Sequence, residues 1–140
     1  MHLPSLGFQG FSVTSGLLAR HLPVPVRAKS IASSMGMKML PLYAASKHGL
    51  LGLTKSLALE YASRGVRVNM VCPGTVTGTG IYDDMTARAP SLVDTLVENV
   101  PSGRLAQPSE IANCVRFLCS DMASYITGQA VYVDGGYSAE

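Results

Sequence analysis

"YAASKHGLLGLTKSLALEYASRGVRVNMVCPGTV", residues 43–76, is the stretch that decides the fold of this chain. Its first part predicts a helix over about 42–63, because three leucines recur at i, i+3 and i+7 and make one apolar face: Leu50, Leu53 and Leu57. The Arg64-Gly65 pair then supplies a basic last turn and a helix stop. The next segment, VRVNMVCPG, predicts a strand over about 67–71 that ends at Pro73-Gly74. A long helix followed after a short gap by an apolar strand is typical of an α/β unit.

The rest of the chain repeats this order of elements. Residues 83–99 are predicted to be partly helical with a break near Pro90, and QPSEIANCVRFLCSD predicts a further helix that begins at Pro108. GQAVYVDGG predicts a second strand bounded by glycines. Helices that alternate with strands favour part of a parallel sheet covered by helices. Residues 1–29 show neither a helical nor a strand period, so we expect them to be poorly structured.

Composition restricts the class of protein. A length of 140 residues suits one domain, and 47% hydrophobic against 14% charged residues indicates a folded chain. The net charge of +2 is too small to indicate a nucleic-acid partner, and no apolar run is long enough to indicate a membrane span. The three cysteines form no C-x-x-C pair, so we expect reduced thiols, a cytoplasmic location and no metal site. The acid-poor first 29 residues leave a transit peptide as the alternative.

Tyr43 and Lys47 are the candidate catalytic pair. At helical spacing they lie one turn apart on the same face. The phenol of a free tyrosine ionises only near about pH 10, and an ammonium a few ångströms away favours the phenolate. Such a pair can move a proton to or from a substrate oxygen. The alternative interpretation of the bare pair is an ordinary exposed helix turn.

Two further segments contribute polar groups to the same candidate site. Ser30 stands thirteen residues before Tyr43, across a loop of small residues, and its hydroxyl is placed to hold the substrate oxygen if that loop folds back. Ser33 and Ser34 are nearby, and we interpret them as polar loop residues. Pro73-Gly74 directly follows a strand, which is where ligands bind in open parallel sheets.

Taken together, these segments resemble the classical short-chain dehydrogenase/reductase family. The resemblance is carried in order and spacing by SIASSMG, YAASK, VRVNMVCPGTV, GRLAQPSEIANCVRFLCSD and SYITGQAVYVDGG, and it covers about residues 30–137. It implies that residues 30–140 are the C-terminal half of the family domain. That half is a partial Rossmann-like, doubly wound parallel sheet with flanking helices. The first βαβ units are missing from this expectation, because residues 1–29 contain neither G-x-x-x-G-x-G nor G-x-G-x-x-G.

The resemblance also implies roles for particular residues. Tyr43 matches the catalytic acid/base, Lys47 the lysine that activates it and binds the nicotinamide ribose, and Ser30 the serine that holds the substrate oxygen. Three residues match the loop that lies along the nicotinamide: Pro73, Gly74 and Val76. The implied function is interconversion of a secondary alcohol and a ketone by hydride exchange with NAD or NADP. The implied partners are a small-molecule alcohol or ketone and further copies of the chain in a homo-oligomer.

Two alternatives stay open at this point. The chain is expected to lack the helix N-terminus that binds the pyrophosphate, so one alternative is a catalytically silent fragment that only associates with full-length subunits. The other is a lyase or isomerase of the same family, which keeps the same tyrosine and lysine. Residues 1–29 do not match the family, and the PVPVRAK segment before Ser30 carries two prolines and two cations that suit a central strand badly.

Overall fold

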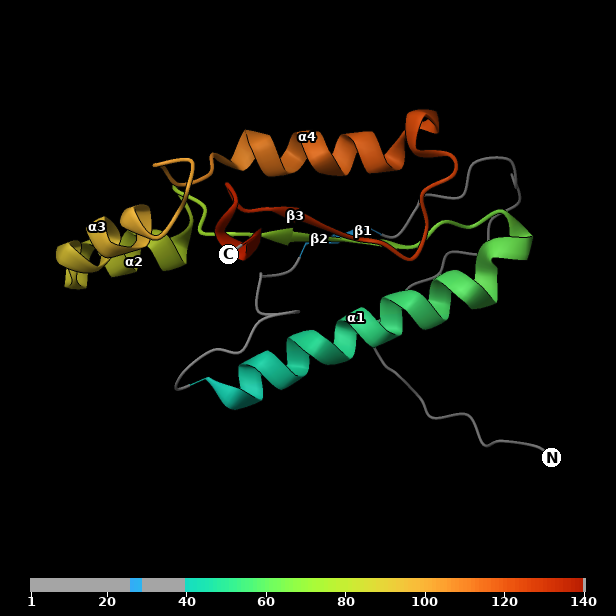
Figure 1. The fold of residues 1–140 in the computed structure, drawn as a ribbon, viewed down its shortest axis with the longest axis horizontal. Coiled ribbons are helices and arrows are strands. Elements are labelled where there is room, and N and C mark those ends of the chain that lie inside the picture. The colour runs from blue at the N-terminus through green and yellow to red at the C-terminus, as the bar shows by residue number, and fades with distance from the viewer. Residues whose placement is uncertain (1–25, 29–39, 140) are drawn as a thin grey trace.

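This computed structural model describes residues 26–28 and 40–139, without the side chains of residues 26–28, Ile81 and Met85. The elements follow in the order β1 (Val26–Ala28), α1 (Pro41–Tyr61), the 3-10 helix η2 (Ala62–Arg64), β2 (Asn69–Pro73), α2 (Gly80–Arg88), α3 (Pro90–Glu98), α4 (Pro108–Cys119), η3 (Asp121–Ala123), β3 (Ala130–Val133) and η4 (Tyr137–Ala139). Figure 1 shows the three layers that these elements make, with α4 on one face of the sheet and α1 on the other. The layers are those of a doubly wound fold.

The sheet is parallel, as the alternating pattern predicts. Its strands lie in the order β1-β2-β3, with Val26 opposite Asn69 and Met70 opposite Ala130. β2 is the middle strand of the described sheet, and three of its residues are completely buried: Met70, Val71 and Cys72. A strand that is covered on both faces is a continuous apolar run, which is why Met70, Val71 and Cys72 follow one another with no polar residue between them.

β1 forms in a segment whose sequence does not favour a strand. Two prolines and two cations make PVPVRAK unsuited to the centre of a sheet, yet Val26–Ala28 pairs in parallel with residues 69–71 of β2. Within the described sheet β1 is an edge strand. An edge strand tolerates a proline beside it, because one side of its ladder has no partner strand to bond.

The core lies between β2 and α4. Val71, Leu118 and Ala123 are fully buried, and Ile111, Val115 and Val131 pack against them. α4 carries Ile111, Val115 and Leu118 at helical spacing, as predicted, and it begins at Pro108 with Gln107 as its N-cap. Removing this apolar surface from water is the main stabilising term for the α4 layer.

α1 covers the opposite face with smaller side chains than the sequence predicts. The helix begins at Pro41, continues through η2 to Arg64 and stops at Gly65, whose φ of 74° is left-handed. Its buried residues are Ala44, Thr54 and Ala58. The predicted leucine face is confirmed only in part, because Leu50 and Leu57 are half-buried while Leu53 is 43% exposed. Small residues face the sheet because the backbone comes close: a Cβ on Gly128 would lie 3.3 Å from the Cβ of Ala58.

β2 begins two residues later than predicted. The side chain of Arg67 donates to the carbonyls of Leu118, Ser120 and Ile126 at 2.8, 3.1 and 3.3 Å, and the N–H of Val68 donates to Thr127 Oγ1. These residues satisfy the carbonyls at and after the C-terminus of α4, which have no partners inside the helix. The ladder of β2 therefore starts only at Asn69.

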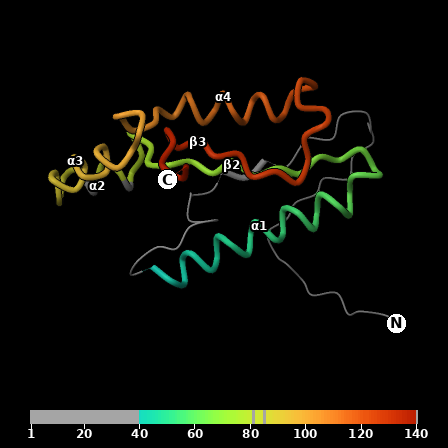
Figure 2. The backbone as a smooth tube through the Cα atoms, in the orientation of Figure 1, coloured from blue at the N-terminus to red at the C-terminus, as the bar shows by residue number. Residues whose placement is uncertain are grey.

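α2 and α3 form a pair of helices between β2 and α4. The predicted break near Pro90 is confirmed, since α2 ends at Arg88 and α3 begins at Pro90, but α2 begins at Gly80, earlier than the predicted residue 83. Figures 1 and 2 show that this pair projects beyond one end of the sheet. In the described part of the chain, no helix combines the length and the hydropathy needed to cross a bilayer.

Candidate active site

The first two turns of α1 hold the predicted catalytic pair. Lys47 Nζ lies over the ring of Tyr43, 4.7 Å from its centroid. Tyr43 is 39% exposed, so part of this residue is accessible from outside. The structure therefore brings the two side chains together, and the ammonium contacts the face of the ring, where a cation is attracted to the π electrons.

Chain topology places this pair at the carboxyl edge of the sheet. β1 and β2 are parallel and α1 stands between them in sequence, so α1 runs antiparallel to both strands. Its first turns consequently lie at the edge where β2 and β3 end, as Figure 1 shows. This edge is where open α/β sheets bind ligands.

The Pro73-Gly74 turn leaves β2 at the same edge. Pro73 is the last residue of β2 and pairs with Val133, and the N–H of Gly74 donates to the Val133 carbonyl at 3.1 Å. A Cβ at Gly74 would lie 3.1 Å from the Cα of Asp134. The close approach of the two strand ends therefore requires a glycine at this position.

Val76 is held by an isolated parallel bridge to Ala106. The N–H of Ala106 donates to the Thr75 carbonyl at 3.1 Å, and the N–H of Thr77 donates to the Ala106 carbonyl at 2.9 Å. Parallel pairing uses the groups on either side of the bridging residue, so the N–H of Val76 itself points away from Ala106. Among the described residues, no hydrogen bond uses that N–H.

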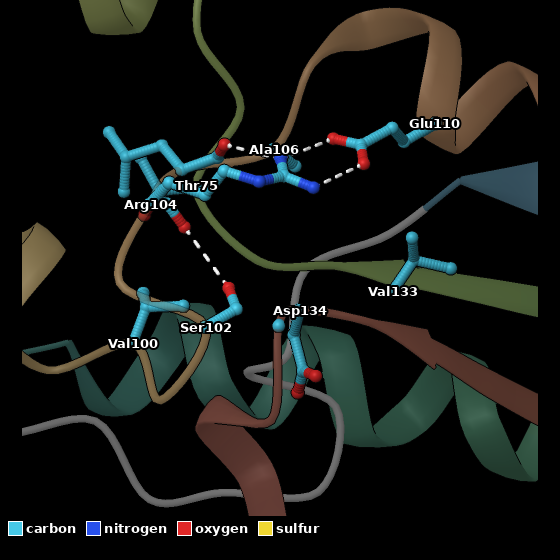
Figure 3. Close-up of a pocket in the computed structure, with 10 residues that line it drawn as sticks. Thr75, Val100, Ser102, Arg104, Ala106, Glu110, Val133 and Asp134 are labelled. Carbon is cyan, nitrogen blue, oxygen red and sulfur yellow. Dashed lines mark hydrogen bonds and ion pairs between the residues drawn. The ribbon is translucent and has the colours of Figure 1, made fainter.

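A pocket of about 120 Å³ lies behind this loop. Figure 3 shows the side chains around it. Its lining comes from the loop after β2, from the segment before α4 and from the end of β3: Thr75, Val100, Ser102, Arg104, Leu105, Ala106, Glu110, Val133, Asp134 and Gly135. Tyr43 and Lys47 are not among them. The pocket is therefore distinct from the predicted catalytic centre.

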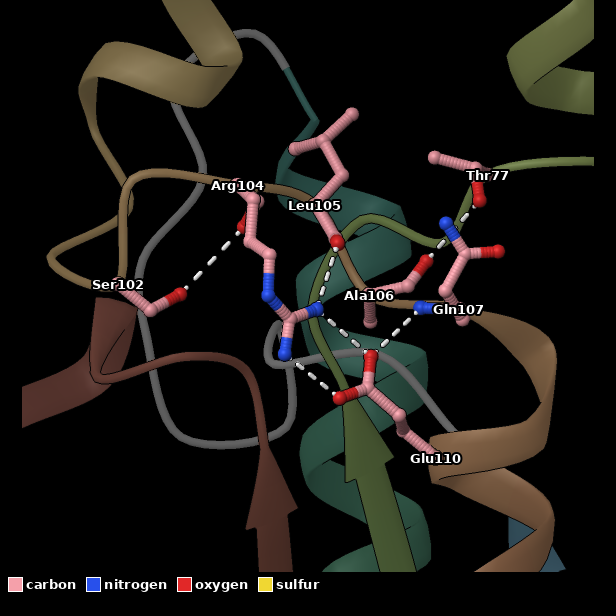
Figure 4. A network of polar contacts seen from close by, with 7 residues as sticks. All are labelled: Thr77, Ser102, Arg104, Leu105, Ala106, Gln107 and Glu110. Carbon is pink, nitrogen blue, oxygen red and sulfur yellow. Dashed lines mark hydrogen bonds and ion pairs between the residues drawn. The ribbon is translucent and has the colours of Figure 1, made fainter.

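Arg104 and Glu110 form an ion pair that the sequence analysis did not identify (Figure 4). Two guanidinium nitrogens of Arg104 donate to the two carboxylate oxygens at 2.7 and 2.8 Å, and the N–H of Gln107 donates to Glu110 Oε2 at 2.8 Å. The hydrogen bond from Arg104, followed by the one from Gln107, lowers the pKa of Glu110 to about 2. A glutamate three residues after an N-cap is the sequence signal that predicts the Gln107 contact. No local sequence pattern predicts that Arg104 pairs with Glu110.

The lowered pKa of Glu110 predicts an acid-sensitive contribution to stability. A carboxyl whose pKa falls on folding stabilises the fold above its ordinary pKa of 4.5, and this contribution is lost as the pH falls toward about 2. We expect urea unfolding midpoints to fall less on acidification across this window in Glu110→Gln than in the natural protein, because a glutamine keeps the contact to Gln107 without titrating. Parallel midpoint curves for the two proteins would contradict the assignment.

Ser30, the third predicted catalytic residue, lies outside the described residues. The chain reaches it two residues after the end of β1 at Ala28. The other predicted site residues are all described: Tyr43 and Lys47 lie on α1, Pro73 ends β2, and Gly74 and Val76 lie in the loop that follows it. Within the described residues, no cluster of three or more His, Cys, Asp or Glu forms a metal site.

Known proteins with similar sequences include dehydrogenases and reductases. One is 2-(S)-hydroxypropyl-CoM dehydrogenase 3 of Xanthobacter autotrophicus, which is 40% identical over 127 residues; the match covers 89% of this chain and 50% of that protein. The chain therefore spans about half the length of this curated relative.

Solved structures agree with the sequence comparison. A short-chain dehydrogenase/reductase family oxidoreductase from Burkholderia thailandensis superimposes with a TM-score of 0.76 and 38% identity, covering 82% of this chain and 44% of that one. A 4-hydroxyisoleucine dehydrogenase solved in complex with NADH has a TM-score of 0.76 and 32% identity, covering 82% of this chain and 46% of that one.

A protein-family model described as enoyl-(acyl carrier protein) reductase matches residues 17–138, which is most of the chain. That match begins upstream of Ser30, so it takes in β1 as well as the segments after it. The strand order, the layers and the relatives agree with it. The chain belongs to the short-chain dehydrogenase/reductase family.

Proposed function

We propose that this chain carries the catalytic centre of an NAD(P)-dependent oxidoreductase that interconverts a secondary alcohol and a ketone by hydride transfer. The observation that carries the proposal is the contact of the Lys47 ammonium with Tyr43, 4.7 Å from the ring centroid, at the start of α1. A phenol beside a fixed cation at the ligand-binding edge of a parallel sheet suits proton transfer to a substrate oxygen. The matched relative acts, by its name, on a hydroxypropyl group.

Tyr43 and Lys47 have separate roles in this proposal. The Tyr43 hydroxyl gives a proton to the ketone oxygen in one direction and takes it from the alcohol in the other. The positive charge of Lys47 favours negative charge on the phenol during that transfer. Ser30 would fix the substrate oxygen by a hydrogen bond.

The donors at this edge fit a nicotinamide cofactor. The N–H of Val76 points away from Ala106 and suits a carboxamide oxygen, while Lys47 suits a ribose hydroxyl. Pro73 and Gly74 would lie along the ring. When bound, the nicotinamide supplies or accepts the hydride, and the solved neighbour with NADH supports this cofactor class.

Exposed leucines on α1 favour a homo-oligomer. Leu42 and Leu59, near the two ends of α1, are 86% and 84% exposed, and exposed apolar side chains along a helix favour a surface that another subunit covers. The same observation favours the second candidate function, a catalytically silent chain that only associates with full-length subunits. A lyase or isomerase keeps the same Tyr43 and Lys47 and differs in the fate of the substrate.

Titration of the purified chain with NADH and with NADPH tests the proposed function. We expect saturable binding that Lys47→Ala abolishes, because that substitution removes the cation from the site. Lys55→Ala is the matched control, since Lys55 is an exposed lysine two turns further along α1. The absence of binding at millimolar cofactor would favour the silent chain.

A further inference from the structure

We propose that Arg104 and Glu110 are a positioning pair for the loop Thr75–Thr77: they hold Ala106, and Ala106 holds Val76. The inference rests on the proposed function, in which the N–H of Val76 binds the cofactor. It adds two residues that contact neither cofactor nor substrate. Their predicted effect is on cofactor affinity.

The bridge to Ala106 is what fixes the loop. Three hydrogen bonds join the two segments: from Ala106 N–H to the Thr75 carbonyl at 3.1 Å, and from both Thr77 N–H and Thr77 Oγ1 to the Ala106 carbonyl at 2.9 and 3.2 Å. In each of these bonds the donor or the acceptor is a backbone group of Ala106. The position of Val76 therefore depends on where the Ala106 backbone lies.

The ion pair holds the backbone on both sides of Ala106 (Figure 4). On one side, Arg104 donates to the Leu105 carbonyl at 3.2 Å. On the other side, the N–H of Gln107 donates to Glu110 Oε2 at 2.8 Å. Since Arg104 also binds both oxygens of Glu110, these contacts close a ring through the backbone of residues 104–110. Ala106 lies in the middle of that ring.

Leu105 is buried, but side-chain packing beside Thr75 and Ala106 is incomplete. The pocket of about 120 Å³ lies beside Thr75 and Ala106, where packed side chains would otherwise support them (Figure 3). This volume is on the order of four water molecules. Polar contacts therefore carry more of the positioning than they do in a close-packed core.

The expected effect is modest because the pair is exposed. The side chains of Arg104 and Glu110 are 60% and 38% exposed, and most exposed ion pairs contribute little. This pair differs in being bidentate and in being attached to the backbone at both ends. We expect its loss to weaken cofactor binding by about 1.5- to 5-fold, the range that such exposed pairs reach.

The experiment compares Arg104→Met, Arg104→Lys and the natural protein by amide hydrogen exchange and by NADH titration. Arg104→Met keeps the aliphatic stem and the Gln107 contact but removes the ion pair. Arg104→Lys keeps the charge and loses the planar fork. The matched control is Arg88→Met, which removes an exposed ion pair of 2.7 Å to Asp84 within α2. Lys47→Ala is measured beside them to test the proposed function itself.

We expect Arg104→Met to speed exchange at the N–H groups of Thr77 and Ala106 and to raise the NADH dissociation constant about 1.5- to 5-fold. Arg104→Lys should give an exchange rate and an NADH dissociation constant between those of Arg104→Met and the natural protein. Arg88→Met should change neither the exchange rate nor the dissociation constant. Unchanged exchange in Arg104→Met would overturn the proposal. So would faster exchange with unchanged NADH affinity while Lys47→Ala abolishes binding. If the natural protein binds no NADH, the proposed function fails, and the exchange rates alone decide whether the pair holds the loop.

Discussion

Tyr43→Phe is expected to lower turnover by about 10²- to 10⁴-fold, the contribution of a positioned general acid–base group. The substitution removes only the hydroxyl, so the ring that Lys47 contacts at 4.7 Å from its centroid stays in place. Cofactor binding should therefore change little. The loss should appear in kcat, because the hydroxyl acts on the substrate oxygen during the chemical step.

The measurement is the appearance of reduced nicotinamide when the protein is supplied with secondary alcohols and NAD or NADP. Tyr61→Phe is the matched control, because Tyr61 is the last residue of the same helix and lies at its other end. Turnover should be unaffected in that control. Tyr43→Phe protein that keeps the natural turnover would show that Tyr43 is not the acid/base.

Leu118→Ala is expected to lower the free energy of unfolding by about 2 to 5 kcal/mol, the range for a leucine deleted from a packed core. Leu118 has no exposed surface and packs with Val71 of the middle strand and with Ala123. The neighbouring backbone leaves little freedom to collapse into the cavity, because the carbonyls of residues 118, 120 and 126 are all bound by Arg67. Urea unfolding followed by circular dichroism measures the change.

Met122→Ala is the control for this prediction. Met122 follows α4 closely in the chain but is 82% exposed, so its substitution should change stability by less than about 0.5 kcal/mol. Equal losses in the two variants would show that α4 is not the main support of the sheet.

Several elements are determined by local sequence. Gly65 ends α1 because the backbone takes a left-handed φ of 74° that favours glycine, and Pro108 begins α4 because a proline has no N–H to leave unsatisfied at the first helical turn. β3 forms between glycines as expected. The spacing of Tyr43 and Lys47 places them on one face of any helix, whatever surrounds it.

Other features depend on which segments pair, and the sequence does not state that. The leucines at 50, 53 and 57 share a helical face, but Leu53 is exposed and the most buried side chains of α1 are Ala44, Thr54 and Ala58, because only small side chains allow the close approach at Gly128. β1 forms beside prolines because it lies at the edge of the described sheet.

The sequence by itself determined the family, the alternation of helices and strands, and the catalytic pair, because each rests on residues that are close along the chain. The tertiary structure decided which face of α1 is buried, where β2 begins, and that Ala106 holds Val76 across a separation of thirty residues. Those contacts join segments that are distant in sequence. Their energies appear only after the sheet has brought the segments together, which is why local patterns do not reveal them.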